Sequence, residues 1–175
     1  ESEDDRNAVV FFLSAYACEP EIDEIICAVA ESFPKMRLIV QVKPIFRKTE
    51  SVRRLIEKLG NTHENIIYAE ESPYKLFNRA KICFSDPSAA ALESIQAGIP
   101  TYLLDLPSVQ KISVFREITD FCLSRPAQVI EKVREAMEGA LEEQSPNFEG
   151  FFAVTGQTFR AQLRSEFLEF QSAER

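Results

Sequence analysis

The feature that most constrains the fold of this chain is an alternation between short apolar runs and segments with helical periodicity. The apolar runs are residues 9–13, 37–42, 66–68, 82–84 and 101–104. The first of them is continuously apolar, which is typical of a parallel strand covered on both faces. The alternation predicts an α/β fold with a doubly wound, Rossmann-like, mainly parallel sheet of five or six strands and helices on both faces.

The segments between these runs carry the predicted helices. Residues 21–32 place their apolar side chains on one helical face, and further helices are expected at 49–59, 73–79 and 126–141. Gly60 and Asn61 are predicted to stop the helix at 49–59, because both residues favour helix ends.

One stretch, residues 81–100, reads as a strand, a tight polar corner, a helix and a stop. Asp86 or Ser85 is predicted to accept hydrogen bonds from the first helix amides, with Pro87 in the first helical position. Gly98 is predicted to end the helix in the left-handed conformation. The small residues at 88–91 leave room over the helix start, and a helix N-terminus beside a strand end is a potential phosphate site.

The predicted topology places this stretch where a ligand is expected. In a doubly wound sheet, ligands bind outside the carboxyl ends of the strands, at the point where the strand order reverses. If the order is 3-2-1-4-5, the reversal lies between the first and fourth strands. The loops there are residues 14–20 and 85–88.

Two sets of charged side chains are candidates for ligand contacts. Glu93 follows Asp86 by seven residues, so two helical turns would place both on one face, where a carboxylate can bind a ribose diol. The alternative is a solvated helix charge. Lys43, Arg47 and Lys48 form a basic loop after the second strand that could neutralise a phosphate, or simply be solvated.

Other polar residues are weaker candidates for ligand contacts. Glu70 and Glu71 are expected in a surface turn whose backbone could contact a base, and Asp105 and Ser108 follow the fifth strand. His63 is the only histidine, which excludes a multi-histidine metal site, and it is expected at the surface on the opposite edge of the sheet. The sequence has no Gly-x-Gly-x-x-Gly turn, no phosphate-binding P-loop and no Gly-x-Ser-x-Gly motif.

Charge and hydropathy exclude some classes of partner. The net charge of −8 argues against a nucleic-acid surface, which needs clustered cations. No apolar run approaches the roughly 20 residues of a membrane-spanning helix. The four cysteines, Cys18, Cys27, Cys83 and Cys122, show no metal-binding spacing and are expected to be reduced thiols in a cytoplasmic protein.

Composition suggests three segments. Residues 1–7 are expected to be a frayed acidic leader, and residues 8–141 a Rossmann-like domain. Residues 142–175 are expected to form a polar connector and a C-terminal helix with an aromatic face. That face would pack on the domain itself or on a missing N-terminal domain.

Residues 85–100, Ser-Asp-Pro-Ser-Ala-Ala-Ala-Leu-Glu-Ser-Ile-Gln-Ala-Gly-Ile-Pro, followed by a strand, resemble the C-terminal half of GT-B glycosyltransferases. The resemblance is to enzymes that build bacterial surface polysaccharides and glycerol-phosphate polymers. In that group a strand ends in a Ser-rich corner, and the next helix carries a Glu before Gly-x-Pro. The Lys43-Pro44 turn is also similar to a Lys-Pro turn of this group.

The resemblance implies a binding site for a nucleotide-diphosphate sugar of the UDP or CDP type. Ser85 and Ser88, with the neighbouring helix amides from Ala89, would face the diphosphate, and Glu93 would bind the ribose. Lys43 would lie nearby, and the corner at residues 70–72 would lie near the base. No cofactor or bound metal is implied, because the helix dipole and basic side chains stabilise the leaving nucleoside diphosphate.

Two departures from the group stand out: Ile45 where many relatives have His, and Asp86, whose negative charge lies in a phosphate corner. The resemblance further implies a second, N-terminal Rossmann-like domain that this chain lacks. The isolated chain is therefore expected to be inactive, and any membrane association would come through the full-length protein. Two alternatives remain open, which are half of a GT-B-like sugar-nucleotide 2-epimerase and a non-catalytic interaction domain.

Overall fold

The structure is a computed structural model that describes residues 6–14, 17, 19–106 and 121–141. The chain forms two compact units, Glu1–Glu143 and Gln144–Arg175, and every described residue lies in the first unit. The predicted connector and aromatic helix at 142–175, and most of the predicted leader, lie outside the described residues.

Strands and helices alternate as predicted. The strands are β1 (Ala8–Leu13), β2 (Arg37–Val42), β3 (Ile66–Tyr68), β4 (Ala80–Ser85), β5 (Thr101–Leu104) and β6 (Cys122–Leu123). The helices are α1 (Pro20–Ser32), α2 (Glu50–Thr62), α3 (Pro73–Phe77), α4 (Ala89–Gln96) and α5 (Pro126–Glu138).

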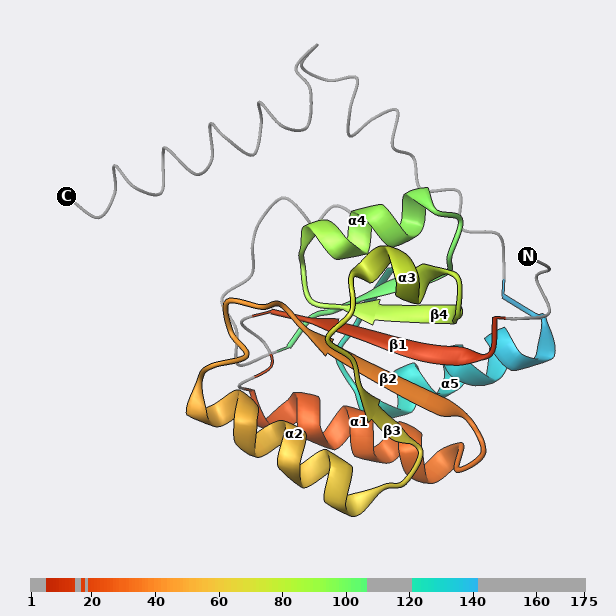
Figure 1. Ribbon diagram of the computed structural model, residues 1–175. Helices are drawn as coiled ribbons and strands as arrows, with labels where there is room; N and C mark the ends of the chain where they lie inside the picture. Colours follow the sequence, from red (N-terminus) through yellow and green to blue (C-terminus); the bar gives the residue numbers. More distant parts are fainter. Residues whose placement is uncertain (1–5, 15–16, 18, 107–120, 142–175) are drawn as a thin grey trace, which may run out of the picture. The chain divides into compact units, whose positions relative to one another are not determined.

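The six strands form one sheet in the order β3-β2-β1-β4-β5-β6, with every pair parallel. The doubly wound prediction is therefore confirmed, and the strand order reverses between β1 and β4 (Figure 1). The two-residue strand β6 brings the sheet to six strands, the larger number of the predicted range.

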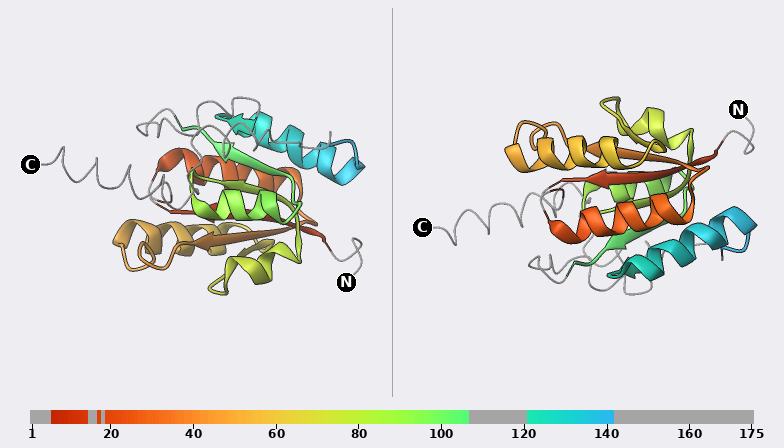
Figure 2. Two further views of the ribbon diagram at one scale, coloured as in Figure 1. Left: turned by 90° about the horizontal axis from the view of Figure 1, so that it is seen from above. Right: turned by 90° about the horizontal axis from the view of Figure 1, so that it is seen from below.

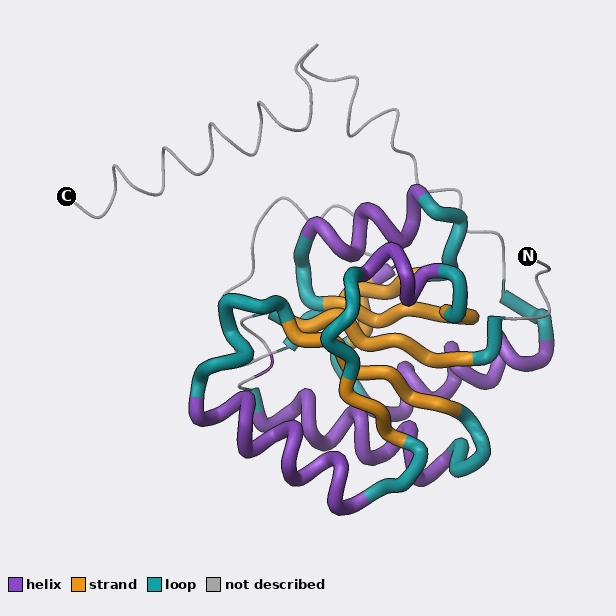
Figure 3. The backbone as a smooth tube through the Cα atoms, in the orientation of Figure 1, coloured by secondary structure: helices purple, strands orange, loops and turns teal. Residues whose placement is uncertain are grey.

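Helices cover both faces of the sheet (Figures 1 and 3). On one face, α1, α2 and α5 pack against a core that includes Val9, Phe11 and Leu13 of β1. On the other face, Leu76 and Phe77 of α3 and Ala90 of α4 pack around Val10 and Phe12 of the same strand. Successive side chains of a strand point to opposite faces, so a continuously apolar β1 serves both cores. Figure 2 shows the two helical layers from above and below.

Several boundaries differ from the sequence predictions. The helix α2 continues through Gly60 to Thr62, because its last turn is not closed by a left-handed glycine. The helix α4 begins at Ala89 with Ser88 as its N-cap, so Pro87 lies before the helix and not in its first turn. Gly98 has φ of 72° just after α4, which confirms the predicted left-handed ending. No helix within the described residues is long and apolar enough to cross a membrane.

Candidate functional site

The ends of β1, β2 and β4 lie side by side at the strand-order reversal. The Lys43 amide donates to the Leu13 carbonyl at 2.8 Å, and the Asp86 amide donates to the Phe12 carbonyl at 3.2 Å. Ser14 continues β1 between these two contacts. The fold therefore gathers Lys43, Ser14 and Asp86 along one carboxyl edge, where ligands bind in doubly wound sheets.

Asp86 joins the two strands that flank the reversal. Its carboxylate oxygen Oδ2 accepts hydrogen bonds from the Ser14 backbone amide at 2.5 Å and from Ser14 Oγ at 2.6 Å, and its residue is 1% exposed. The prediction that Asp86 caps the helix is wrong. The carboxylate bonds the β1 loop across the sheet, and the helix starts two residues later than an Asp86 cap would require.

The start of α4 is capped by Ser88 without a side-chain hydrogen bond to the helix amides. Instead, Ser88 Oγ lies 3.1 Å from Ser85 Oγ, and Ser85 Oγ donates to the Asp86 carbonyl at 2.8 Å. The first amides of a helix have no carbonyl partner inside it. The Ala91 amide donates to the Ser88 carbonyl at 3.1 Å, and Ala89, the first residue of α4, is exposed at the carboxyl edge.

The predicted ligand residues of this stretch differ in accessibility. Ser85 is fully buried, so its hydroxyl supports Ser88 and does not reach the surface. Ser88 and Glu93 are half-buried. Glu93 lies four residues after Ala89, on the same side of α4, whereas Asp86 lies outside the helix and cannot share a helical face with it. The Glu93 side chain makes no hydrogen bond or ion pair within the described residues.

The basic side chains of the loop after β2 differ in their exposure and contacts. Lys43 and Lys48 are exposed, and neither ammonium group forms an ion pair in the described part of the chain. Ile45, which stands where many members of the resembling group have His, is 74% exposed. Arg47 is half-buried and bonds to backbone, with Nε donating to the Val42 carbonyl at 2.8 Å and Nη2 donating to the Glu70 carbonyl at 3.3 Å.

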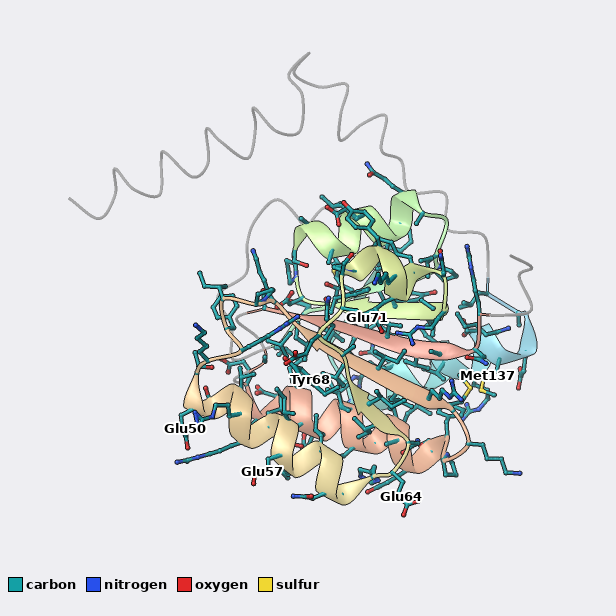
Figure 4. The ribbon with its side chains drawn as sticks, viewed as in Figure 1. Glu50, Glu57, Glu64, Tyr68, Glu71 and Met137 are labelled. Atoms are coloured by element: carbon teal, nitrogen blue, oxygen red, sulfur yellow. The ribbon has the colours of Figure 1, made fainter. Side chains whose placement is uncertain are left out.

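The corner after β3 is held by this arginine and by a buried glutamine of β2. Gln41 is 5% exposed, and its Nε2 donates to the Glu71 carbonyl at 2.6 Å. The Glu71 side chain, which Figure 4 labels, in turn forms an ion pair with Arg79. Burial raises the pKa of the Tyr68 hydroxyl, and the Arg47 guanidinium acts in the opposite direction. Gln41 was not predicted as a site residue, although a Gln inside an apolar strand signals a buried hydrogen-bond partner.

A pocket of about 270 Å³ lies on the open face of β2 and β3, beside this corner. Its lining includes Arg37, Ile39, Ile67 and Arg79. Arg37 begins β2, so the pocket extends toward the amino ends of the strands. The pocket also reaches Glu70 and Glu71 after the carboxyl end of β3, but its lining holds no residue at the carboxyl edge of the β1/β4 reversal.

The remaining described candidates, His63 and Asp105, make contacts within the fold. His63 follows α2 at the amino end of β3, as expected, but its side chain is only 14% exposed and its Nε2 lies 3.9 Å from Glu31 Oε1. It is therefore less exposed than predicted. Asp105 follows β5 and its amide bonds to the Leu123 carbonyl, and Ser108 lies outside the described residues.

The described cysteines Cys27, Cys83 and Cys122 form no disulfide. Burial, reinforced by Asp23, raises the pKa of Cys27 to about 11, and burial also raises the pKa of Cys83. Both are therefore protonated near neutral pH and weakly nucleophilic. The described residues contain no group of three or more His, Cys, Asp or Glu side chains that could hold a metal ion.

No protein-family model matches the sequence, and no curated protein matches it. Solved structures do match. The UDP-GlcNAc 2-epimerase of Neisseria meningitidis, bound to UDP-GlcNAc, has 20% identity and a TM-score of 0.53 over 75% of this chain and 36% of the epimerase. The S. aureus MnaA complex with UDP has 13% identity and a TM-score of 0.52 over 79% of this chain and 39% of MnaA.

This chain thus spans less than two-fifths of the length of either solved structure. At these identities the likeness establishes the fold. The chain has a doubly wound, Rossmann-like fold that it shares with part of each of these two structures.

Proposed function

We propose that this chain is the donor-binding half of a GT-B glycosyltransferase. The complete enzyme transfers a sugar, or a related nucleotide-activated group, from a UDP- or CDP-type donor to a polysaccharide or cell-surface acceptor. A second Rossmann-like domain supplies the acceptor site, so the isolated chain binds the donor without turning it over. The proposal rests on the fold and on the motif at residues 85–100.

The observation that carries this proposal is the position of the α4 N-terminus. It opens at the β1/β4 reversal with Ser88 half-buried and Ala89 exposed. Unpaired helix amides and the helix dipole together favour a phosphate group at such a position. The buried Asp86 carboxylate is hydrogen-bonded to Ser14, so its bonding oxygen is directed to the β1 loop.

The proposed roles follow the positions of the side chains. Ser88 and the Ala89 amide bind the diphosphate. The buried Ser85 hydroxyl is hydrogen-bonded to the Ser88 hydroxyl and positions it. Lys43, exposed at the end of β2, supplies the counter-charge. The Glu93 carboxylate, which forms no ion pair or hydrogen bond within the described residues, binds the ribose diol, and the backbone at residues 70–72 faces the base. Helix amides and Lys43 would stabilise the leaving nucleoside diphosphate without a metal ion.

Glu93→Ala tests this site directly. Removing a carboxylate that binds two hydroxyl groups should weaken nucleotide binding by about tenfold, since hydrogen bonds to charged groups contribute about 1.5–3 kcal/mol. Titration of the chain with UDP, CDP and UDP-GlcNAc, followed by amide NMR shifts, gives the affinities. Glu57→Ala is the matched control, because Glu57 is an exposed acid on α2 (Figure 4). If no nucleotide shifts any amide between Ser85 and Glu93, the donor-site proposal is wrong.

A second candidate function is half of a sugar-nucleotide 2-epimerase. It is supported by the fold likeness to the epimerase that was solved with UDP-GlcNAc. Both candidates require the same nucleotide site, so binding experiments cannot separate them. A product assay on protein that carries both Rossmann-like domains does. An epimerised nucleotide sugar formed without an acceptor favours the epimerase, and sugar transfer that depends on an acceptor favours the glycosyltransferase.

A further inference from the structure

Two side-chain hydrogen bonds hold the backbone of the corner between β3 and α3, and a third anchors one of their donors to the end of β2. Arg47 Nη2 donates to the Glu70 carbonyl at 3.3 Å while its Nε donates to the Val42 carbonyl at 2.8 Å. Gln41 Nε2 donates to the Glu71 carbonyl at 2.6 Å. Two consecutive carbonyls of the corner are therefore bonded to side chains that belong to β2 and to the loop after it. We call Arg47 and Gln41 the corner clamp.

The clamp determines which way the corner backbone faces. The described peptide bonds are all trans, and in a trans peptide the C=O and N–H groups point in opposite directions. Holding the carbonyls of Glu70 and Glu71 toward the clamp therefore turns the amides of Glu71 and Ser72 away from it. Residues 70–72 are all exposed, so their outer backbone is accessible to a ligand.

The clamp also explains two unusual side chains. Gln41 is a buried polar residue within an otherwise apolar strand, and such a residue is costly unless it is hydrogen-bonded. Arg47 belongs to a basic loop that the sequence left open as a phosphate contact or a solvated loop, yet two of its guanidinium donors bond backbone carbonyls on either side of it. The planar guanidinium presents donors on separate nitrogens at a fixed spacing, here Nε and Nη2, whereas a lysine offers its three donors from a single nitrogen.

We propose that Arg47, together with Gln41, is a positioning residue that sets the base-facing backbone at residues 70–72. The clamp thereby supports recognition of the nucleobase, and not of the phosphates. This inference rests on the proposed function, because it assumes that a nucleotide occupies the carboxyl edge. It assigns Arg47 a role different from that of Lys43, although both belong to the same basic loop.

The test compares ligands with and without a base. UDP and ribose 5-phosphate are titrated into the 175-residue chain and into its Arg47→Ala and Arg47→Lys variants, with affinities from amide NMR shifts. Arg47→Ala should weaken UDP binding by about tenfold, because charge-assisted hydrogen bonds fix the corner. Ribose 5-phosphate affinity should not change. Arg47→Lys should give an intermediate loss for UDP, since lysine keeps the positive charge but lacks the rigid two-nitrogen fork.

Equal weakening of both ligands would overturn the inference, because it would mean that Arg47 binds phosphate or merely stabilises the fold. An unchanged affinity for UDP would also overturn it. Arg53→Ala is the matched control, because Arg53 is an exposed arginine on α2 that pairs only with Glu50 in the described part of the chain.

A second measurement on the ligand-free chain separates this inference from the proposed function. Arg47→Ala should speed amide hydrogen exchange at residues 69–72 while leaving exchange in β1 and β4 unchanged. If wild-type chain binds no nucleotide, the proposed function fails, and the exchange data still report on the clamp. Unchanged exchange at residues 69–72 would show that Arg47 does not hold the corner.

Discussion

At the scale of single residues, Asp86 shows how a buried charge can be accommodated beside a proposed phosphate site. A buried carboxylate is costly unless hydrogen bonds replace its water. Ser14 supplies two such bonds to one carboxylate oxygen, from its amide and from its hydroxyl. Asp86 therefore links the two strands at the reversal, and the same contact sets where the β1 loop begins.

Replacing Asp86 tests this link. Asp86→Ala should lower the free energy of unfolding by about 2–3 kcal/mol, because it leaves the Ser14 amide without its acceptor inside the protein. Asp86→Asn keeps an acceptor oxygen and should cost less. Ser14→Ala, which removes only the hydroxyl bond, should cost about 1 kcal/mol. Urea denaturation followed by circular dichroism measures all three. Wild-type stability in Asp86→Ala would contradict the role described for this carboxylate.

At the scale of elements, Gly60 and Gly98 are both predicted to end a helix, but their backbone conformations differ. Gly60 lies inside α2 with ordinary helical backbone, and a Cβ atom placed on it would meet nothing within 4 Å. Gly98 follows α4 with φ of 72°, in the left-handed region. There the Gly98 amide donates to the Ile95 carbonyl at 2.9 Å and closes the helix end. Only at Gly98 does the backbone conformation require a glycine.

This contrast predicts opposite effects of one substitution. Gly60→Ala should raise the free energy of unfolding by about 0.5–1 kcal/mol, because alanine favours the helix and restricts the unfolded chain. Gly98→Ala should lower it by about 1–2 kcal/mol, because a Cβ atom strains the left-handed conformation. Urea midpoints of the two variants provide the comparison. Destabilisation by Gly60→Ala would mean that α2 ends before this residue, as the sequence alone suggests.

At the scale of the whole sheet, β1 contributes to both hydrophobic cores. Phe11 stacks on Phe84 of β4 with ring centroids 5.3 Å apart, on the face covered by α1, α2 and α5. Phe12 meets Phe77 of α3 edge-on at 5.6 Å, on the opposite face. β1 thus lies between the two helical layers and contributes side chains to both cores. The two cores should therefore unfold together.

Truncation of either ring tests this coupling. Phe11→Ala and Phe12→Ala should each lower the free energy of unfolding by about 3–5 kcal/mol, because both rings are fully buried. Each variant should also unfold in a single transition, with the same midpoint by far-UV circular dichroism and by tyrosine fluorescence. Separate midpoints for the two signals would show that the two faces unfold independently.

The sequence predicted those features of the candidate site that depend only on residues close together in the chain. The helix stop at Gly98 and the accessible Ser88 and Ala89 beside a strand end follow from neighbouring residues. The shared face predicted for Glu93 and Asp86 is wrong, because Asp86 lies outside α4, and the ribose role of Glu93 stays a prediction. The partners of Asp86 and Arg47 could not be predicted, because nothing nearby in sequence distinguishes a cap or a phosphate ligand from a contact made across the fold.

By itself the sequence determined the fold class and the limits of β2, β3 and β5, because apolar runs and helical periodicity are local properties of the chain. Only the tertiary structure decided which polar side chains meet. Asp86 bonds a residue 72 positions away, Gln41 one 30 away and Arg47 one 23 away. The physical reason is that a polar group bonds to the partner that folding brings within reach, and the strand order sets that partner.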